Sequence, residues 1–273
     1  MLVEALVYAR ARFSGQGNPH GHLTEQVGLW ARHRRQRAAW AEHLDKARGL
    51  CLRAANACPE HARRTALVLG AGLLLDVPLA ELSALFGRVV LADMAFLPEV
   101  RAQARNFCNV ECRETDLTGC LDLLPGLAAQ APPLPSAPLP DLTLGLADLD
   151  FVCSANLLSQ LPLLALTALR KRAPSLEAET LRGFAASLVR AHLEALRRLP
   201  CPACLVTDVT ERGLADGRLT YETGLLFGVE PDLPGDTWLW RMAPGGEAAP
   251  GLDVERLVLG APDVHAGRKG GEA

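Results

Sequence analysis

The sequence has 273 residues, a formal net charge of −3 and 49% hydrophobic residues, an ordinary composition for a globular protein. This composition excludes a disordered acidic tail and a coiled coil, and the slightly acidic charge balance argues against a dedicated nucleic-acid binder. No segment reaches the ~18 uninterrupted apolar residues of a membrane span, and the start of the chain lacks the apolar run of a secretory signal. We therefore expect a cytoplasmic protein whose eight cysteines are mostly free thiols, several of them buried as small hydrophobic residues.

Residues 1–60 are predicted to form a helical N-terminal extension with a break at residues 14–19. Thr24 is a plausible N-cap for a helix over residues 25–48, and a second helical piece follows over residues 49–58. The first helix carries a basic cluster from Arg32 to Arg37. This cluster has three interpretations: a phosphate or RNA contact, a cap over a ligand pocket, or a solvated helix face. We favour the solvated face, with arginine stems packed beside Trp30 and Trp40.

Residues 61–273 are predicted to form one α/β domain. Short apolar runs at residues 65–69, 89–93, 110–115, 149–153 and 204–208 read as strands, and two more strand candidates follow at 237–242 and 254–259. Helical patterns lie between them at residues 78–86, 96–107, 120–130, 157–172 and 176–199. Strands that alternate with helices of this length are typical of βαβ units, and therefore of a parallel sheet.

Small and polar residues follow the ends of four predicted strands. They are Gly70 and Gly72 after the first strand, Asp93 after the second, Asp116 after the third, and Ser154 and Asn156 after the fourth. Gly70 and Asp93 are 23 residues apart, as are Asp93 and Asp116, which leaves room for one helix and one strand each time. In an open parallel sheet, ligands bind at the carboxyl ends of the strands.

The chemistry of these residues describes an adenosine pocket. Glycine allows a sharp turn and a close backbone approach to a ligand, and a carboxylate at the next strand end can accept both hydroxyls of a ribose. Asp116 offers an acceptor to the adenine amine, and Leu117 offers an apolar wall. The third glycine of a dinucleotide fingerprint is missing after Gly72, so an adenosine without a pyrophosphate fits better.

In order and spacing, these residues resemble the Rossmann-like (class I) S-adenosylmethionine-dependent methyltransferases over about residues 60–260. The resemblance implies a doubly wound, mostly parallel seven-stranded sheet whose last strand is antiparallel, with the two tail strands as that hairpin. It also implies cofactor contacts at Gly70, Ala71, Gly72, Asp93, Met94, Asp116, Leu117, Ser154 and Asn156. Asp93 would bind the ribose, Met94 would lie beside the adenine, and the main chain near Ser154 would face the methionine ammonium.

The sequence also departs from this family. Val68 stands where the family usually has an acidic residue, and Leu74 stands where a further glycine is common. Residues 154–160 do not have the pattern that marks amino methylation of bases and glutamine. We expect a methyltransferase with an unidentified catalytic base and an unknown acceptor, for which a small molecule is slightly favoured. A non-catalytic binding or scaffold protein of the same fold and a nicotinamide-dependent oxidoreductase are the alternatives.

Other residues with chemical potential have simpler interpretations. His192 falls on an apolar helix face and is expected to be a hydrogen-bonded core residue. Cys201 and Cys204 have redox or zinc spacing, but a second such pair is missing from the sequence and a strand follows them, so we expect no function. His20 and His22 are too isolated for a metal site.

Overall fold

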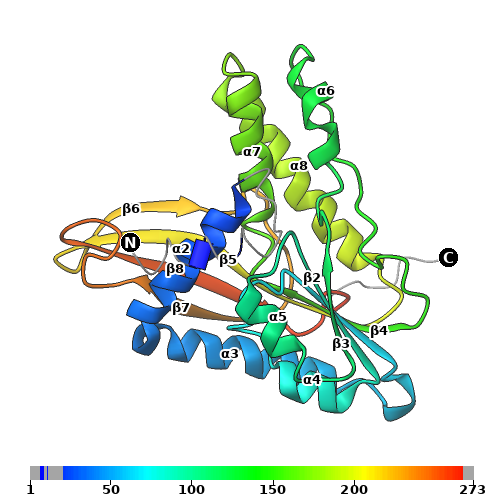
Figure 1. Ribbon diagram of the computed structural model, residues 1–273. Helices are drawn as coiled ribbons and strands as arrows, with labels where there is room; N and C mark the ends of the chain where they lie inside the picture. The colour runs from blue at the N-terminus through cyan, green and yellow to red at the C-terminus, as the bar shows by residue number, and fades with distance from the viewer. Residues whose placement is uncertain (1–6, 9–10, 12–20, 267–273) are drawn as a thin grey trace.

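The computed structural model describes residues 7–8, 11 and 21–266 of the chain. A mixed sheet lies between two layers of helices (Figure 1). Its strands are β1 (Thr65–Leu69), β2 (Arg88–Asp93), β3 (Val110–Glu114), β4 (Leu149–Ala155), β5 (Ala203–Ala215), β6 (Arg218–Gly224), β7 (Asp236–Ala243) and β8 (Leu252–Ala261). The predicted break at residues 14–19 and His20 lie outside the described residues.

The strand order is β3-β2-β1-β4-β5-β8-β7, and neighbours from β3 to β5 are parallel. β8 is antiparallel to both β5 and β7. The order reverses between β1 and β4, which is the switch point of a doubly wound sheet. The predicted α/β fold is therefore confirmed, with its mostly parallel sheet and its antiparallel last strand.

The predicted number of seven strands is wrong, because β6 is an eighth. β6 pairs only with the distal half of β5, and all seven of its residues are exposed. A strand without a buried face has no apolar alternation, so the sequence pattern does not show it.

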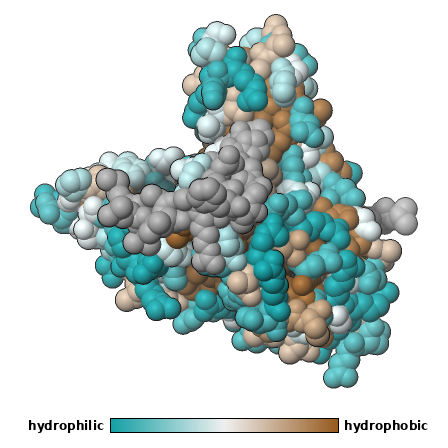
Figure 2. All heavy atoms as spheres, viewed as in Figure 1, coloured by the Kyte–Doolittle hydropathy of each residue, from teal (hydrophilic) through white to brown (hydrophobic). Residues whose placement is uncertain are grey.

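Helices cover both faces of the sheet. α3 (Arg37–Asn56), α4 (Leu79–Leu85) and α5 (Pro98–Ala104) lie on one side. α7 (Leu161–Arg172) and α8 (Ala178–Arg197) lie on the other, where their outer parts and α6 (Leu124–Ala128) form an arm (Figure 1). Figure 2 shows hydrophobic residues along this arm. Two short 3-10 helices, η1 (Glu60–Ala62) and η2 (Leu121–Leu123), precede β1 and follow β3.

The core is built by alternation along the strands. In β1, Ala66 and Val68 pack into the cluster under α3, whereas Leu67 and Leu69 pack into the cluster against α8. All five residues of β1 are buried. A strand that is buried on both faces reads as a continuous apolar run, which is why the prediction of residues 65–69 matches the strand.

The N-terminal helices differ from the prediction. α2 (His22–Arg35) and α3 are separate helices that meet at Gln36, and Thr24 lies inside α2, whose N-cap is Gly21. Gln36 contacts Glu247, and Trp40 donates a hydrogen bond of 2.9 Å to the carbonyl of Met242. These contacts with residues 242–247 lie at the bend and just after it. A pattern within one segment does not predict them.

α3 shares one hydrophobic core with the sheet and contacts β4, β5, β7 and β8. Within the described residues, no helix combines the length and the apolar character that crossing a membrane requires.

Candidate functional site

The ends of β1, β2 and β4 meet at the carboxyl edge of the sheet, near the switch point. The amides of Gly70 and Ala71 donate to the carbonyl of Ala92, at 2.9 and 3.2 Å. The amide of Asn156 donates to the carbonyl of Val206 at 2.9 Å. The turns after these strands are therefore extensions of the sheet, and they bring the predicted glycines and Asp93 to one edge.

Asp93 bridges two of these turns. Its Oδ2 accepts a hydrogen bond of 2.8 Å from the amide of Gly72, and its Oδ1 accepts one of 2.7 Å from the amide of Met94. Burial raises the pKa of the Asp93 carboxyl to about 6, and hydrogen bonds from the amides of Gly72, Met94 and Ala95 oppose that rise. Since a carboxylate offers about four acceptor positions, three amides leave one position for a ligand hydroxyl.

Asp116 organises the loop that leads from β3 to η2. Its Oδ1 accepts hydrogen bonds from the amide and the hydroxyl of Thr118, at 2.8 and 2.6 Å, and its Oδ2 accepts one of 2.9 Å from the amide of Leu121. Leu117 is 4% exposed and packs in the core on the α8 side. Met94 packs against the cluster around α6, α7 and α8. Asp116 thus keeps about one acceptor position, and Leu117 serves the core.

The two glycines of the first turn have different surroundings. Gly70 has a φ of +77°, and a Cβ there would lie 2.7 Å from Cβ of Leu157 and 2.9 Å from the carbonyl oxygen of Ala155. Gly72 has a φ of +46°, but a Cβ there would meet nothing closer than 3.8 Å. Close packing against the turn after β4 therefore accounts for Gly70. Ala71 is 1% exposed and belongs to the core.

Ser154 faces the core on the side of α8. Its hydroxyl lies 3.2 Å from Nε2 of His192, and both residues are at most 1% exposed. Burial lowers the pKa of His192 to about 3, so the imidazole is neutral at pH 7. The prediction that His192 is a hydrogen-bonded core residue is confirmed.

Asn156 belongs to a buried polar network that the sequence analysis did not find. Its amide nitrogen lies 2.6 Å from Oδ2 of Asp76 and 3.2 Å from Nε2 of His43. Nε1 of Trp238 donates a hydrogen bond of 3.1 Å to Nδ1 of His43, and the ring of His43 stacks on Trp240 at 4.1 Å. Four segments that are distant in the sequence therefore meet here, and the spacing of their residues along the chain does not predict this contact.

The hydrogen-bond donors in this network fix the protonation of His43. Because an indole nitrogen only donates, Nδ1 of His43 must accept, and the proton of the neutral imidazole lies on Nε2. Burial lowers the pKa of His43 to about 3, so a doubly protonated ring is excluded at pH 7. The proton on Nε2 points at the amide of Asn156.

The amide of Asn156 consequently has two settings. In the first setting, the amide nitrogen of Asn156 donates a hydrogen bond to an ionised Asp76. Oδ1 of Asn156 is then buried without a partner among the described residues. Turned by half a rotation, the oxygen accepts from Nε2 of His43 and from a protonated Asp76. Burial raises the pKa of Asp76, and the two settings of Asn156 correspond to the two protonation states of this carboxyl group. The network thus couples the proton of Asp76 to the orientation of Asn156.

A second buried charge lies at the same edge on β5. Asp208 is 0% exposed, and its Oδ2 accepts a hydrogen bond of 2.6 Å from Nη1 of Arg256 on β8. Arg256 also donates to Glu211 at 3.0 Å and lies over the ring of Trp240. Oδ1 of Asp208 is buried without a partner among the described residues. Asp208 follows the fifth predicted strand as Asp93 follows the second, a signal that the sequence analysis could have used.

A cavity of about 510 Å³ opens beside the turn after β1. Its lining is basic and aromatic on one side, apolar on the other, and polar at one end: Trp30, His33, Arg34, Arg37, Leu73, Leu75, Leu97, Glu99, Val100 and Gln103. The first four residues come from the N-terminal helices, and the leucines at 73 and 75 follow the glycine turn. The cavity therefore lies next to the predicted site, although neither Asp93 nor Asp116 lines it.

Several members of the basic cluster contact other parts of the protein. The guanidinium of Arg34 lies over the ring of Trp30 at 4.8 Å, and Arg35 forms an ion pair of 2.7 Å with Glu247. Arg32 contacts the sulfur of Met242 at 3.5 Å. The Arg34 contact fits the predicted packing of arginine beside tryptophan. Arg32 and Arg35 instead contact residues 242–247, which the prediction of a solvated face did not include.

No protein-family model matches the sequence, and no curated protein is similar to it. Among solved structures, the chain is similar to the DhpI-SAH complex, with 17% sequence identity, 85% of this chain and 93% of that chain covered, and a TM-score of 0.32. It is also similar to the Burkholderia thailandensis 1,6-didemethyltoxoflavin-N1-methyltransferase with bound 1,6-didemethyltoxoflavin and S-adenosylhomocysteine, with 15% identity, 91% and 92% covered, and a TM-score of 0.35. Because both TM-scores are below 0.5, the fold assignment rests on the strand order described above.

Proposed function

We propose that the chain binds S-adenosylmethionine at the carboxyl edge of its sheet and transfers the methyl group to a small molecule. The observation that carries this proposal is the position of Asp93. Its carboxyl group ends β2, beside the turn at Gly72, in a sheet whose order reverses at the neighbouring strand β1. A nucleoside without phosphate suits this edge, since the turn lacks the further glycine of a pyrophosphate-binding loop.

The donor set of this edge fits the cofactor in part. Asp93 and Asp116 each keep about one acceptor position, enough for one ribose hydroxyl and for the adenine amine. In the setting with an ionised Asp76, Asn156 has a buried oxygen without a partner among the described residues, and Asp76 lies beside it. These two side chains would hold the ammonium group at the methionine end. If Asp93 is to accept hydrogen bonds from both ribose hydroxyls, it must first lose the hydrogen bond from one of its backbone amides.

The acceptor would occupy the cavity beside the turn after β1. A volume of about 510 Å³ lies in the range of small-molecule sites, which is roughly 300–1,000 Å³. Leu73, Leu75 and Leu97 provide an apolar wall, and Arg37 provides a positive charge at the rim. This lining suits a small acceptor with an apolar body and an acidic group.

When bound, the cofactor supplies a methyl group that its sulfonium already activates. The chain's own residues would then act by orientation, which brings the acceptor in line with the methyl group. The helices α2 and α3 would cover the edge and exclude water. Both His43 and His192 are neutral and hydrogen-bonded inside the protein, so we assign neither as a general base.

Isothermal titration calorimetry with S-adenosylmethionine and with S-adenosylhomocysteine tests this proposal. We expect both to bind, and we expect Asp93→Ala to weaken binding by about 1.5–3 kcal/mol, the cost of losing a hydrogen bond to a charged group. Asp122→Ala is the matched control, because this acid is exposed on η2 and should leave binding unchanged. Absence of binding by the native protein would overturn the proposal, and so would equal effects of the two variants.

A non-catalytic binding module of the same fold is the second candidate. Two observations favour it. Backbone amides already donate hydrogen bonds to the carboxylates of Asp93 and Asp116, and Leu157 packs closely against Gly70. It predicts that purified protein, denatured and analysed by mass spectrometry, releases no adenosyl compound and that calorimetry detects none binding. Copurification of S-adenosylmethionine or S-adenosylhomocysteine would exclude this second candidate and support the first.

A further inference from the structure

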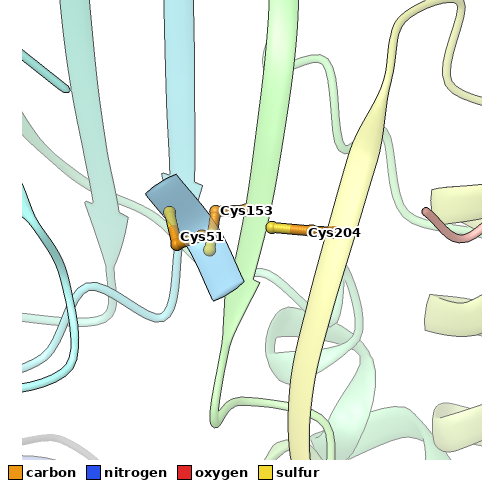
Figure 3. Close-up of side chains that lie close together, drawn as sticks. All are labelled: Cys51, Cys153 and Cys204. Carbon is orange, nitrogen blue, oxygen red and sulfur yellow. The ribbon is translucent and has the colours of Figure 1, made fainter. Parts of the chain in front are cut away.

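Three cysteines from distant parts of the chain meet in the core beneath α3 (Figure 3). Cys51 lies on α3, Cys153 on β4 and Cys204 on β5, and their sulfur atoms lie within 4.8 Å of one another. Cys153 and Cys204 are register partners on parallel strands, so their side chains project from the same face of the sheet. α3 brings Cys51 over that face.

The cluster is closed to solvent and has no fourth ligand among the described residues. The three cysteines are 1%, 2% and 0% exposed, in the order given above. Within the part of the chain that the structure describes, no histidine, acid or further cysteine joins the group as a metal ligand. Structural zinc sites are almost always tetrahedral, with four protein ligands, so three thiols alone do not fit zinc.

Charge also argues against metal cations at this position. Cations bind thiolates, and three thiolates at positions that are at most 2% exposed would place charge in the apolar core. Three thiolates around a divalent ion would leave one net negative charge, and around a monovalent ion two. A net charge in the apolar core beside Asp76 costs several kcal/mol or more. The cluster therefore suits a ligand that reacts with neutral thiols.

We propose that Cys51, Cys153 and Cys204 form a binding site for a trivalent, thiophilic metalloid hydroxide such as arsenous acid. In the reaction, three arsenic–oxygen bonds break and three arsenic–sulfur bonds form. Each thiol proton leaves with a hydroxide as water, and arsenic remains trivalent. The neutral hydroxide and three neutral thiols give a neutral tris-thiolate complex, so no charge enters the core. Three sulfur ligands complete the coordination of trivalent arsenic, which matches the absence of a fourth ligand among the described residues.

The same burial makes binding slow. A ligand can reach sulfur atoms that are at most 2% exposed only when α3 opens locally from the sheet, an event that native proteins undergo at a free-energy cost. We therefore expect the binding rate to rise in low concentrations of urea that leave the protein folded.

Native mass spectrometry of the reduced, full-length protein after incubation with sodium arsenite tests the site. We expect one arsenic to be gained and three hydrogens to be lost, and X-ray absorption at the arsenic edge to show three sulfur neighbours and no oxygen. Cys153→Ala should abolish the three-sulfur complex. Cys120→Ala is the matched control, because Cys120 is also 0% exposed but lies outside the cluster, and it should leave the complex intact.

Several outcomes would overturn this inference. They are the absence of an adduct, an arsenic–oxygen contact in the absorption spectrum, and an unchanged complex in Cys153→Ala. Displacement of arsenic by equimolar Zn²⁺ or Cu⁺ would also overturn it, because it would show a cation site. If Cys153→Ala does not fold, the sulfur count in the native protein decides. These readouts need no bound adenosyl cofactor, so they remain independent of the proposed methyl transfer.

Discussion

Replacing Gly70 with alanine tests whether this glycine is required by packing. At its φ of +77° an L-residue costs about 1–2 kcal/mol. The new Cβ would lie 2.7 Å from Cβ of Leu157 and 2.9 Å from the carbonyl oxygen of Ala155. Because one of these atoms belongs to the backbone, relief requires a shift of the turn after β4, and such overpacking costs about 1–3 kcal/mol. We expect a total loss of about 2–5 kcal/mol in the free energy of unfolding.

Urea denaturation measures this loss, and Gly217→Ala separates its two parts. Gly217 has a φ of +73°, and nothing lies within 4 Å of the position that a Cβ would take there, so this control carries the conformational cost alone, about 1–2 kcal/mol. If Gly70→Ala loses no more stability than Gly217→Ala, the packing argument is refuted. Gly72→Ala, where a Cβ has room, should resemble the control in stability.

Two ion pairs that each contain a buried carboxylate give further predictions. Asp150 accepts three hydrogen bonds from Arg64, which lower the pKa of its carboxyl. Asp150→Asn should cost about 1–3 kcal/mol at pH 7. Stability that comes from a depressed pKa is present above the unfolded value and is lost in acid, so urea titrations should show this gap closing below about pH 4. Arg256→Met leaves Asp208 buried and unpaired, and should cost about 3–5 kcal/mol by the same assay. Arg212→Met, which breaks an exposed pair, should cost at most about 1 kcal/mol, and equal losses in these two variants would contradict the argument.

The parts of the fold that the sequence predicts are those with a buried pattern. The predicted bounds of β1 match to the residue, and the alternation of strands and helices predicts the parallel sheet. The distal half of β5 and all of β6 escape prediction, because their residues are mostly exposed or half-buried. Without a buried face, a strand is specified by its pairing partner, which a pattern along one segment does not contain.

The candidate site is predictable in position but not in detail. Asp93 lies at the expected strand end, because the length of a βαβ unit fixes where the next strand stops. Its bonds to the amides of Gly72 and Met94 depend on the shape of two turns, which residue spacing does not determine. The network of Asp76, His43 and Asn156 requires the N-terminal helix and the sheet to be docked, and only the folded chain shows this.

The place of β8 in the sheet has a consequence for biosynthesis. β8 is the last of the described strands in sequence, but it lies between β5 and β7, and α3 rests against it. During translation, the flank of β5 and the part of α3 that β8 contacts stay uncovered until residues 252–261 have left the ribosome. Nascent chains with such exposed surfaces are prone to aggregation and depend on chaperones. A ribosome stalled a short distance before these residues are made would therefore carry an unfinished sheet.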